Sequence, residues 1–156
     1  MSDVSWLSPE EERAWRAYRR MRTLLDLQNA RDLARDSHLS ESDYDVLSTI
    51  TEKPGRSWRA SELAARLLWS TSRLAHHAGR MERRGLIARG ECAEDGRGAT
   101  VTLTDAGWAA LQAAAPAHVA SVRRHFIDLL TPAEVQTLAD VAGKVLAHFG
   151  EPQQAV

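Results

Sequence analysis

The fold of this 156-residue chain is decided by residues 70–104, STSRLAHHAGRMERRGLIARGECAEDGRGATVTLT. In the first part of this stretch, Leu74, Ala78 and Met81 follow one another at intervals of four and three residues. This spacing predicts a helix with one buried stripe. Gly85 comes next, at a position where a glycine commonly ends a helix because it accepts the left-handed backbone conformation. The stretch therefore opens with a helix that ends near residue 84.

The other face of this predicted helix is polar and basic. Its side chains can all point at one partner: Ser72, Arg73, His76, Arg80 and Arg83. Ser70 and Ser72 stand at the helix start, where hydroxyls and free backbone N–H groups can bind a phosphate. Simple capping is the alternative role for these serines, and both roles can hold at once. Arg83 and Arg84 are either phosphate-facing or solvated.

A hairpin is predicted after the helix. Leu86-Ile87 begins a strand, residues 94–98 (EDGRG) form a turn by composition, and Ala99 to Thr104 returns with Val101 and Leu103 alternating with threonines. A polar, basic helix followed by a basic-tipped hairpin is typical of a winged helix. That arrangement places the helix in a DNA major groove and the wing tip beside it.

Size and composition narrow the class of protein. The chain fits one domain, or one domain with an oligomerisation arm, and its 44% hydrophobic and 26% charged residues favour a folded globular protein. No apolar run approaches the roughly 20 residues of a membrane helix, so no membrane partner is expected. The acidic N-terminus lacks a signal-peptide core, and one cysteine makes no internal disulfide. These features predict a cytoplasmic location.

Charge is unevenly distributed although the net charge is only −1. Residues 56–97 contain nine arginines and five acidic residues, a net charge of +4, whereas residues 1–55 carry −3 and residues 98–156 carry −2. This is the pattern expected if only the middle of the chain meets phosphate. A segment of +4 is modest, and pairs of solvated helices also reach it.

The segment before the helix-hairpin stretch predicts three further elements. Ser40 caps a helix that ends at Lys53-Pro54-Gly55, and residues 57–59 can form a short strand that pairs with the hairpin. A short helix over 61–68 directs four residues inward, namely Leu63, Ala64, Leu67 and Leu68. Two short helices joined by a tight turn, the second polar and basic, form a helix-turn-helix.

Long helices are predicted at both ends of the chain. Ser8 begins the first with a capping box, and it runs to about Arg35. Its apolar side chains cover more than one face: Trp15, Tyr18, Met21, Leu24, Leu25, Leu27 and Leu33. Such a helix needs cover on two sides, which the winged-helix lobe and a second subunit can supply; a single thick core is the alternative.

The C-terminal part predicts two more helices. One runs over about 105–129, where Pro116 should kink it or start a new segment. Thr131 opens the last helix with a second capping box, and this helix reaches about Phe149. The fold class is therefore mainly α with a small β wing. We expect a single domain over 1–156, in which 39–104 is a winged helix-turn-helix lobe and 8–38 and 105–150 are dimerisation helices.

Taken in order, these parts resemble the MarR family of dimeric bacterial transcription regulators over residues 8–149. Five stretches carry the resemblance: LSESDYDVL (39–47), SELAARL (61–67), RMERRGLIAR (80–89), EDGRG (94–98) and VTLTDAG (101–107). The resemblance implies a homodimeric repressor whose paired polar helices enter successive major grooves of a roughly palindromic operator. The chain departs from the family pattern at Ala75, His76 and His77, which puts in doubt the DNA sequence that it reads.

The resemblance also implies roles for individual residues. The DNA-binding set is Ser70, Ser72, Arg73, His76, Arg80, Asp95 and Arg97. Arg97, at a glycine-flanked tip, can reach into the minor groove, where negative potential is concentrated, and Asp95 can hold it by a charge-assisted hydrogen bond. By turn composition alone, these two residues form a solvated turn with an incidental ion pair.

The family analogy adds a small aromatic or anionic effector bound between the dimer base and the DNA-binding lobe. Trp15, Tyr18 and Tyr44 are candidates to line its pocket, or they are core residues. A second hypothesis remains open, in which the chain is a winged-helix protein-interaction or ligand-binding module that no longer reads DNA. The two are discriminated by whether the protein retards the promoter of its own gene or of the divergent neighbouring gene at moderate salt.

Enzyme, metal and redox roles have weaker support in the sequence than DNA binding has. A nucleophile elbow, a phosphate loop and paired carboxylates are absent, so neither an enzyme nor a cofactor is predicted. The adjacent His76 and His77 point about 100° apart on a helix, and no zinc-binding motif occurs, so no metal site is predicted. His77 falls near the buried stripe, which favours a packed histidine. Cys92 beside the wing turn is oxidisable if nearby arginines lower its pKa.

Overall fold

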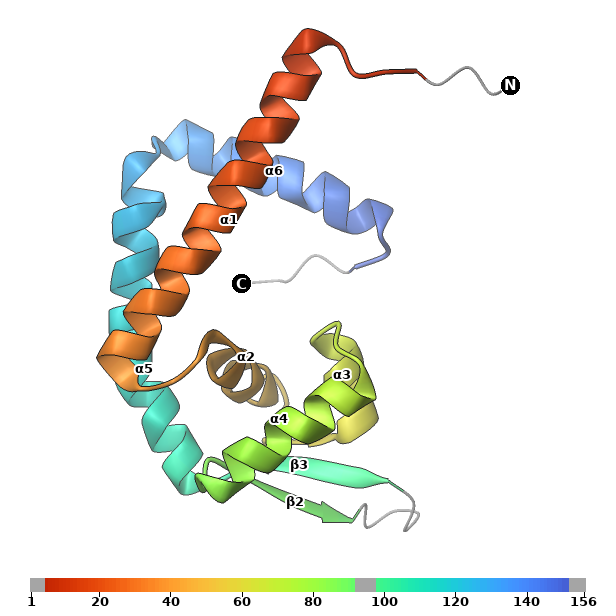
Figure 1. Ribbon diagram of the computed structural model, residues 1–156, viewed down its shortest axis with the longest axis vertical. Helices are drawn as coiled ribbons and strands as arrows, with labels where there is room; N and C mark the ends of the chain where they lie inside the picture. The colour runs from red at the N-terminus through yellow and green to blue at the C-terminus, as the bar shows by residue number, and fades with distance from the viewer. Residues whose placement is uncertain (1–4, 92–97, 152–156) are drawn as a thin grey trace. The chain divides into compact units, whose positions relative to one another are not determined.

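The structure, a computed structural model, describes residues 5–91 and 98–151 (Figure 1). It is mainly helical with a small antiparallel sheet, which confirms the predicted winged-helix fold class. In chain order its elements are α1 Pro9–Ser37, α2 Glu41–Ile50, β1 Ser57–Arg59, α3 Ala60–Arg66, α4 Thr71–Arg83, β2 Ile87–Glu91, β3 Ala99–Leu103, α5 Asp105–His125, the 3₁₀ turn η1 Ile127–Leu129 and α6 Pro132–His148.

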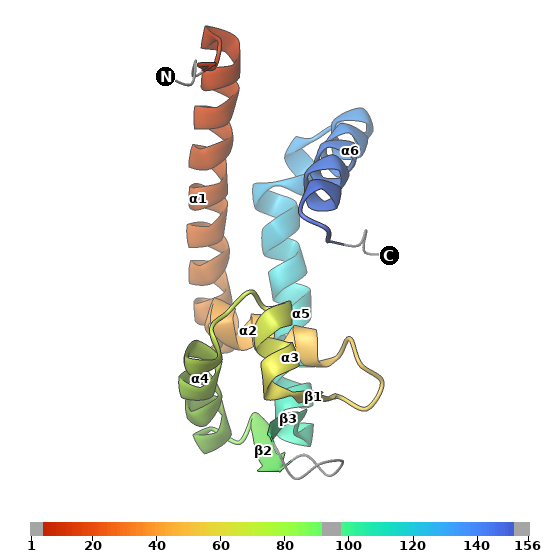
Figure 2. The ribbon, with the colours of Figure 1, turned by 90° about the vertical axis from the view of Figure 1, so that its right-hand side faces the viewer.

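The sheet has the strand order β1-β3-β2, and both pairings are antiparallel. Trp58 lies opposite Val101, and Ile87 lies opposite Leu103. The short strand at 57–59 therefore pairs with the hairpin, as predicted. Figures 1 and 2 show α2, α3 and α4 on one face of this sheet.

Helices begin where the capping residues predict. Ser8, Ser40 and Thr131 each accept a hydrogen bond from the backbone N–H three residues later, and each forms a complete capping box. Ser70 also caps α4 with its side chain, whose hydroxyl accepts from the Arg73 N–H at 3.1 Å, but without a capping box because the third helical residue is Arg73. Gly85 follows α4 with a φ of +73°, which confirms that a glycine ends this helix.

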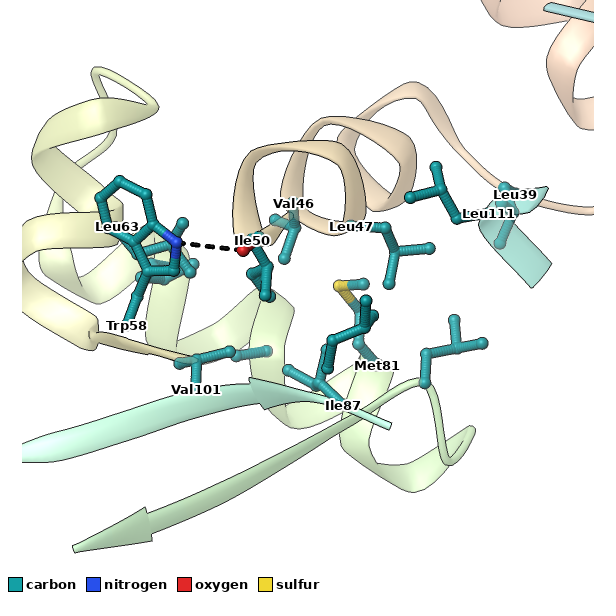
Figure 3. Close-up of a cluster of buried hydrophobic side chains, with 14 of the residues drawn as sticks. Leu39, Val46, Leu47, Ile50, Trp58, Leu63, Met81, Ile87, Val101 and Leu111 are labelled. Carbon is teal, nitrogen blue, oxygen red and sulfur yellow. Dashed lines mark hydrogen bonds between the residues drawn. The ribbon is translucent and has the colours of Figure 1, made fainter. Parts of the chain in front are cut away.

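The hydrophobic core lies between these helices and the sheet (Figure 3). The predicted stripe of α4 is fully buried, since Leu74, Ala78 and Met81 are each at most 1% exposed. The other large side chains of the core include Val46, Leu47, Ile50, Trp58, Leu63, Ile87 and Val101. The Trp58 indole N–H donates to the Ile50 carbonyl at 3.3 Å, so the polar atom of this buried ring is satisfied.

Three local predictions were wrong. Leu68 is 82% exposed rather than inward, because α3 ends at Arg66 and Leu68 takes a left-handed conformation (φ +55°) in the turn before α4. Helix α2 ends at Ile50, before the Lys53-Pro54-Gly55 segment. Helix α5 ends at His125 rather than near 129, because Phe126 leaves the helical conformation and a 3₁₀ turn follows.

The chain divides into two compact units, Met1–His118 and Val119–Val156. Helix α5 runs through Pro116 as one continuous helix, so no new segment starts at this proline. In the second unit, α6 leaves a set of apolar side chains at least 36% exposed, namely Val135, Leu138, Val141, Val145 and Leu146. Among the described helices, none combines the length and the apolar character that crossing a membrane requires.

Candidate nucleic-acid interface

One face of α4 is exposed along its whole length. It carries the predicted contact residues Ser72, Arg73, His76 and Arg80, with Ser70 at the cap and Arg83 at the last turn. Because the opposite stripe is buried in the core, the fold holds these side chains on the outside. The Ser70 hydroxyl accepts the Arg73 N–H, and its own hydrogen is still available to donate to a phosphate oxygen.

The arginines on this face contact neutral groups. The Arg73 guanidinium lies 4.0 Å above the Trp69 ring, Arg80 Nη2 lies 2.8 Å from His77 Nδ1, and Arg83 Nε donates to the Gly79 carbonyl. In the part of the chain that the structure describes, none of the three forms an ion pair with a carboxylate. Their charge is therefore available to an external anion.

Other arginines of the same lobe are already neutralised. Arg66 Nε donates to Glu52 at 2.8 Å, Arg84 Nη1 to Asp43 at 2.7 Å and Arg89 Nε to Glu82 at 2.8 Å, three ion pairs within the lobe. Arg84 is therefore paired with Asp43 of α2, although its side chain remains 44% exposed. Among the described arginines, Arg73, Arg80 and Arg83 of α4 therefore differ from Arg66, Arg84 and Arg89, which are paired with carboxylates of the lobe.

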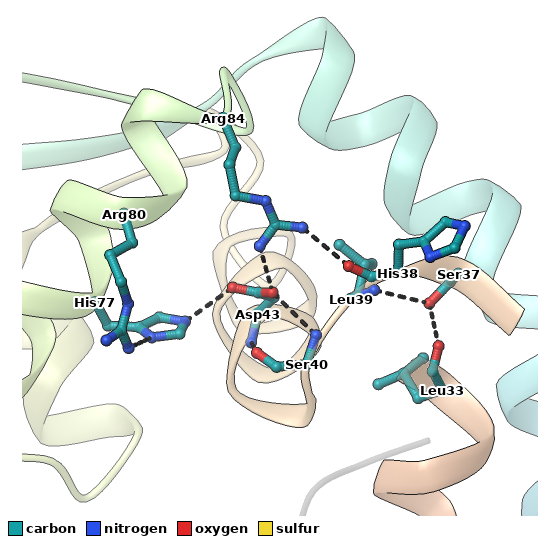
Figure 4. Close-up of polar contacts among 9 residues, drawn as sticks. All are labelled: Leu33, Ser37, His38, Leu39, Ser40, Asp43, His77, Arg80 and Arg84. Carbon is teal, nitrogen blue, oxygen red and sulfur yellow. Dashed lines mark hydrogen bonds and ion pairs between the residues drawn. The ribbon is translucent and has the colours of Figure 1, made fainter. Parts of the chain in front are cut away.

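Asp43 is the centre of a buried polar network between α2 and α4 (Figure 4). Its carboxylate accepts from the Ser40 N–H at 2.9 Å and from Arg84 Nη1, and it lies 3.0 Å from His77 Nε2. Arg84 also donates to the His38 carbonyl at 3.0 Å, which joins the corner between α1 and α2 to the end of α4. Sequence reasoning missed this network. Its one local signal was the capping-box spacing of Ser40 and Asp43.

His77 is only 7% exposed, which confirms the prediction of a packed histidine. Burial lowers the pKa of His77, although the Asp43 carboxylate acts in the opposite direction. Burial likewise lowers the pKa of His118. For Asp43, burial would raise the pKa, but the hydrogen bonds from Ser40 and Arg84 outweigh it, so the pKa of Asp43 lies below its ordinary value.

The two lowered histidine pKa values predict a pH-dependent stability. As pH falls below the ordinary histidine pKa of about 6.5, the unfolded chain binds protons that the native chain does not, so the free energy of unfolding decreases. His77→Gln removes one of these two groups. The stability of the His77→Gln variant, measured by urea denaturation, is therefore expected to fall less steeply than that of the wild type as the pH is lowered from 7 to 5. Parallel curves for the two proteins would contradict this prediction.

The three candidate effector residues fall into two groups. The Trp15 and Tyr18 rings stack at 5.8 Å, and Tyr44 lies 4.4 Å from the His118 ring. Tyr18 is 20 residues before His38, about 30 Å along α1, whereas Tyr44 lies in α2 just beyond that corner. One chain does not bring the three side chains together.

Several predicted residues lie outside the described part of the chain. Asp95 and Arg97 at the wing tip are among them, and so is Cys92. Within residues 5–91 and 98–151, no group of three or more histidine, cysteine, aspartate or glutamate side chains is arranged to hold a metal ion.

Comparisons with known proteins give consistent results. The MarR family matches residues 39–98. AbsC, a MarR family transcriptional regulator from Streptomyces coelicolor, is 38% identical over 94% of this chain and 98% of its own, with a TM-score of 0.87. Sco3205, a MarR family transcriptional regulator from the same organism whose structure contains DNA, is 35% identical over 99% of this chain and 96% of its own, with a TM-score of 0.88.

A more distant structure shares the fold. Bordetella bronchiseptica BpsR, whose DNA binding is regulated by 6-hydroxynicotinic acid, is 20% identical over 85% of this chain and 98% of its own, with a TM-score of 0.73. No curated protein sequence matches the chain.

Proposed function

Because this chain belongs to the MarR family of transcriptional regulators, we propose that it is a homodimeric repressor that binds a roughly palindromic operator and is released by a small-molecule effector. The family consists of regulators rather than enzymes. The two α4 helices of the dimer would enter successive major grooves, about one helical turn apart, with the wings in the flanking minor grooves.

One observation carries the DNA-binding part of the proposal. Arg73, Arg80 and Arg83 are exposed on a single face of α4 and form no ion pair within the described residues, while Arg66 and Arg89 nearby are paired. Cations that lack an internal carboxylate partner can release counterions from a phosphate backbone and donate to base edges. The DNA complex of Sco3205, at 35% identity, supports the same role for this chain.

The homodimer rests on apolar surface at both ends of the chain. In α1, Trp15, Tyr18 and Leu24 are each at least 46% exposed, and α6 carries its own exposed apolar set. Apolar surface of this extent commonly marks an interface with another protein. We take a second copy of the chain as the partner, because a homodimer would cover this apolar surface and would also present two α4 helices to the DNA.

The effector is proposed by analogy with BpsR, which responds to an aromatic acid. Tyr44 and His118 are the candidate contacts within one chain, since their ring centroids lie 4.4 Å apart and His118 Nδ1 is buried without a hydrogen-bond partner among the described residues. Trp15 and Tyr18 would join this pocket from the second copy.

The test is a gel-shift titration of the protein on its own upstream region at moderate salt, with and without aromatic acids. Arg73→Ala is expected to weaken binding about tenfold, because an exposed contact to DNA is lost. The matched control is Arg66→Ala, which removes an equal charge that already pairs with Glu52 and should change the affinity little. A wild-type protein that retards neither this region nor that of the neighbouring gene would favour the protein-interaction module instead.

Arg97→Ala is expected to weaken binding to every duplex tested and to make the salt dependence of the affinity shallower. A minor-groove arginine at the wing tip contributes attraction that depends little on base sequence. Affinities measured at several salt concentrations check both effects. An unchanged affinity would reject this role for Arg97.

A further inference from the structure

Three residues form a continuous chain of polar contacts from the buried network to the exposed face of α4 (Figure 4). The Asp43 Oδ1 atom lies 3.0 Å from His77 Nε2, and His77 Nδ1 lies 2.8 Å from Arg80 Nη2. Asp43 and His77 are buried, whereas Arg80 is exposed among the predicted DNA contacts. This series of contacts therefore links α2 to an exposed side chain on the predicted DNA-binding face of α4.

The chemistry of the three groups assigns the protons. A guanidinium is always charged and can only donate, so His77 Nδ1 must accept from Arg80 and carry no proton. The ring proton is then on Nε2, whose neighbour is the Asp43 carboxylate at 3.0 Å, a contact that has the distance but not the alignment of a hydrogen bond. Only the neutral tautomer with the proton on Nε2 is compatible with both contacts. A protonated imidazole would place a second N–H against the arginine.

The ring itself is held in place by its surroundings. The Trp69 ring packs against His77 edge-on at 5.5 Å and 89°. The Asp43 carboxylate is fixed in turn by the Ser40 N–H and by Arg84. A long arginine side chain on a helix surface otherwise loses considerable rotamer entropy when it binds a ligand.

We propose that Asp43 and His77 are positioning residues that orient the Arg80 guanidinium for DNA before the DNA arrives. The inference rests on the proposed function in its last step, because Arg80 must then contact the duplex. Its first step, an ordered Arg80 on a neutral His77, is a property of the free protein. The two steps can be tested separately.

Nuclear magnetic resonance of the free wild-type dimer tests the first step. The ¹⁵N shifts of the His77 ring should place the proton on Nε2 at neutral pH, and ¹⁵N relaxation should show the Arg80 Nε–H to be ordered. Arg83 is the internal comparison and should be more mobile, because within the described part of the chain its side chain hydrogen-bonds only to a backbone carbonyl of its own helix. A proton on Nδ1, or an Arg80 as mobile as Arg83, would overturn the proposal without any DNA experiment.

Two variants separate hydrogen bonding from packing. His77→Phe keeps a ring against Trp69 but has no acceptor, so Arg80 should become mobile. His77→Gln offers a carbonyl acceptor for Arg80 and an NH2 donor for Asp43, the two functions that the neutral imidazole supplies, and should keep Arg80 ordered. In both variants Asp43 retains Ser40 and Arg84 as partners. If Arg80 stays ordered in His77→Phe, the proposal is wrong.

The second step is measured with the duplex of the protein's own upstream region. Arg80→Ala should weaken specific binding about tenfold in the wild type and in His77→Gln, but clearly less in His77→Phe, where the arginine is no longer oriented. An equal loss in all three backgrounds would show that Arg80 does not depend on His77. A wild type that binds no DNA but shows an ordered Arg80 would refute the proposed function while leaving the tautomer and the order of Arg80 established.

Discussion

Replacing Gly107 with alanine is expected to destabilise the protein by about 4 kcal/mol or more, a large part of the stability of a typical domain. Gly107 is buried near the start of α5, directly against the backbone of Leu86, which lies between α4 and β2. A Cβ atom there would collide with the Leu86 carbonyl oxygen and with the Leu103 side chain. Because the first of these is backbone, no side-chain rotation relieves the collision.

The surrounding hydrogen bonds prevent α5 from moving away. The Gly107 N–H donates to the Thr104 hydroxyl at 3.0 Å, and that hydroxyl donates to the Gly85 carbonyl at 2.6 Å. Gly55→Ala is the matched control, since a Cβ at Gly55 meets nothing within 4 Å. Urea denaturation followed by circular dichroism should show a large loss for Gly107→Ala and little change for Gly55→Ala. Equal stabilities for the two variants would refute the close approach.

Removing the Asp43 carboxylate is expected to have the second-largest effect. Asp43→Ala should destabilise the protein by about 3 kcal/mol at pH 7, because the Ser40 capping box is broken and the buried ion pair with Arg84 is lost. This loss of stability is at the lower end for a broken buried ion pair. The Arg84 side chain is 44% exposed, so in the Asp43→Ala variant its charge can be solvated by water. Glu41→Ala, an exposed change in the same first turn, is the control and should cost at most about 0.5 kcal/mol.

The difference between wild type and Asp43→Ala should also depend on pH. The pKa of Asp43 is lower in the native chain than in the unfolded chain, so its contribution is complete above the ordinary aspartate value of about 4. The contribution is lost as pH falls through the lowered native value. Denaturation curves at several pH values should therefore converge in acid, and a gap that is constant down to pH 2 would contradict the role of the carboxylate.

Much of this architecture could be predicted from local patterns. The stripe of Leu74, Ala78 and Met81 and the capping residues Ser8 and Ser40 are signals confined to one or two helical turns, and each appears in the structure where expected. Such signals survive without knowledge of the fold, because helix periodicity and cap hydrogen bonds involve residues three or four positions apart. The exposed basic face of α4 follows from the same periodicity.

The partners of the charged groups could not be predicted in this way. Arg84 and Asp43 are 41 residues apart in the chain, and nothing local distinguishes Arg84 from Arg83, which forms no ion pair among the described residues. Likewise, Leu68 looks like a core residue by its type, but the turn between α3 and α4 carries it into solvent. Periodicity therefore decided which side of each helix is buried. Long-range packing decided which arginines are neutralised inside the lobe and which remain for a partner, because an ion pair depends on the positions of two elements at once.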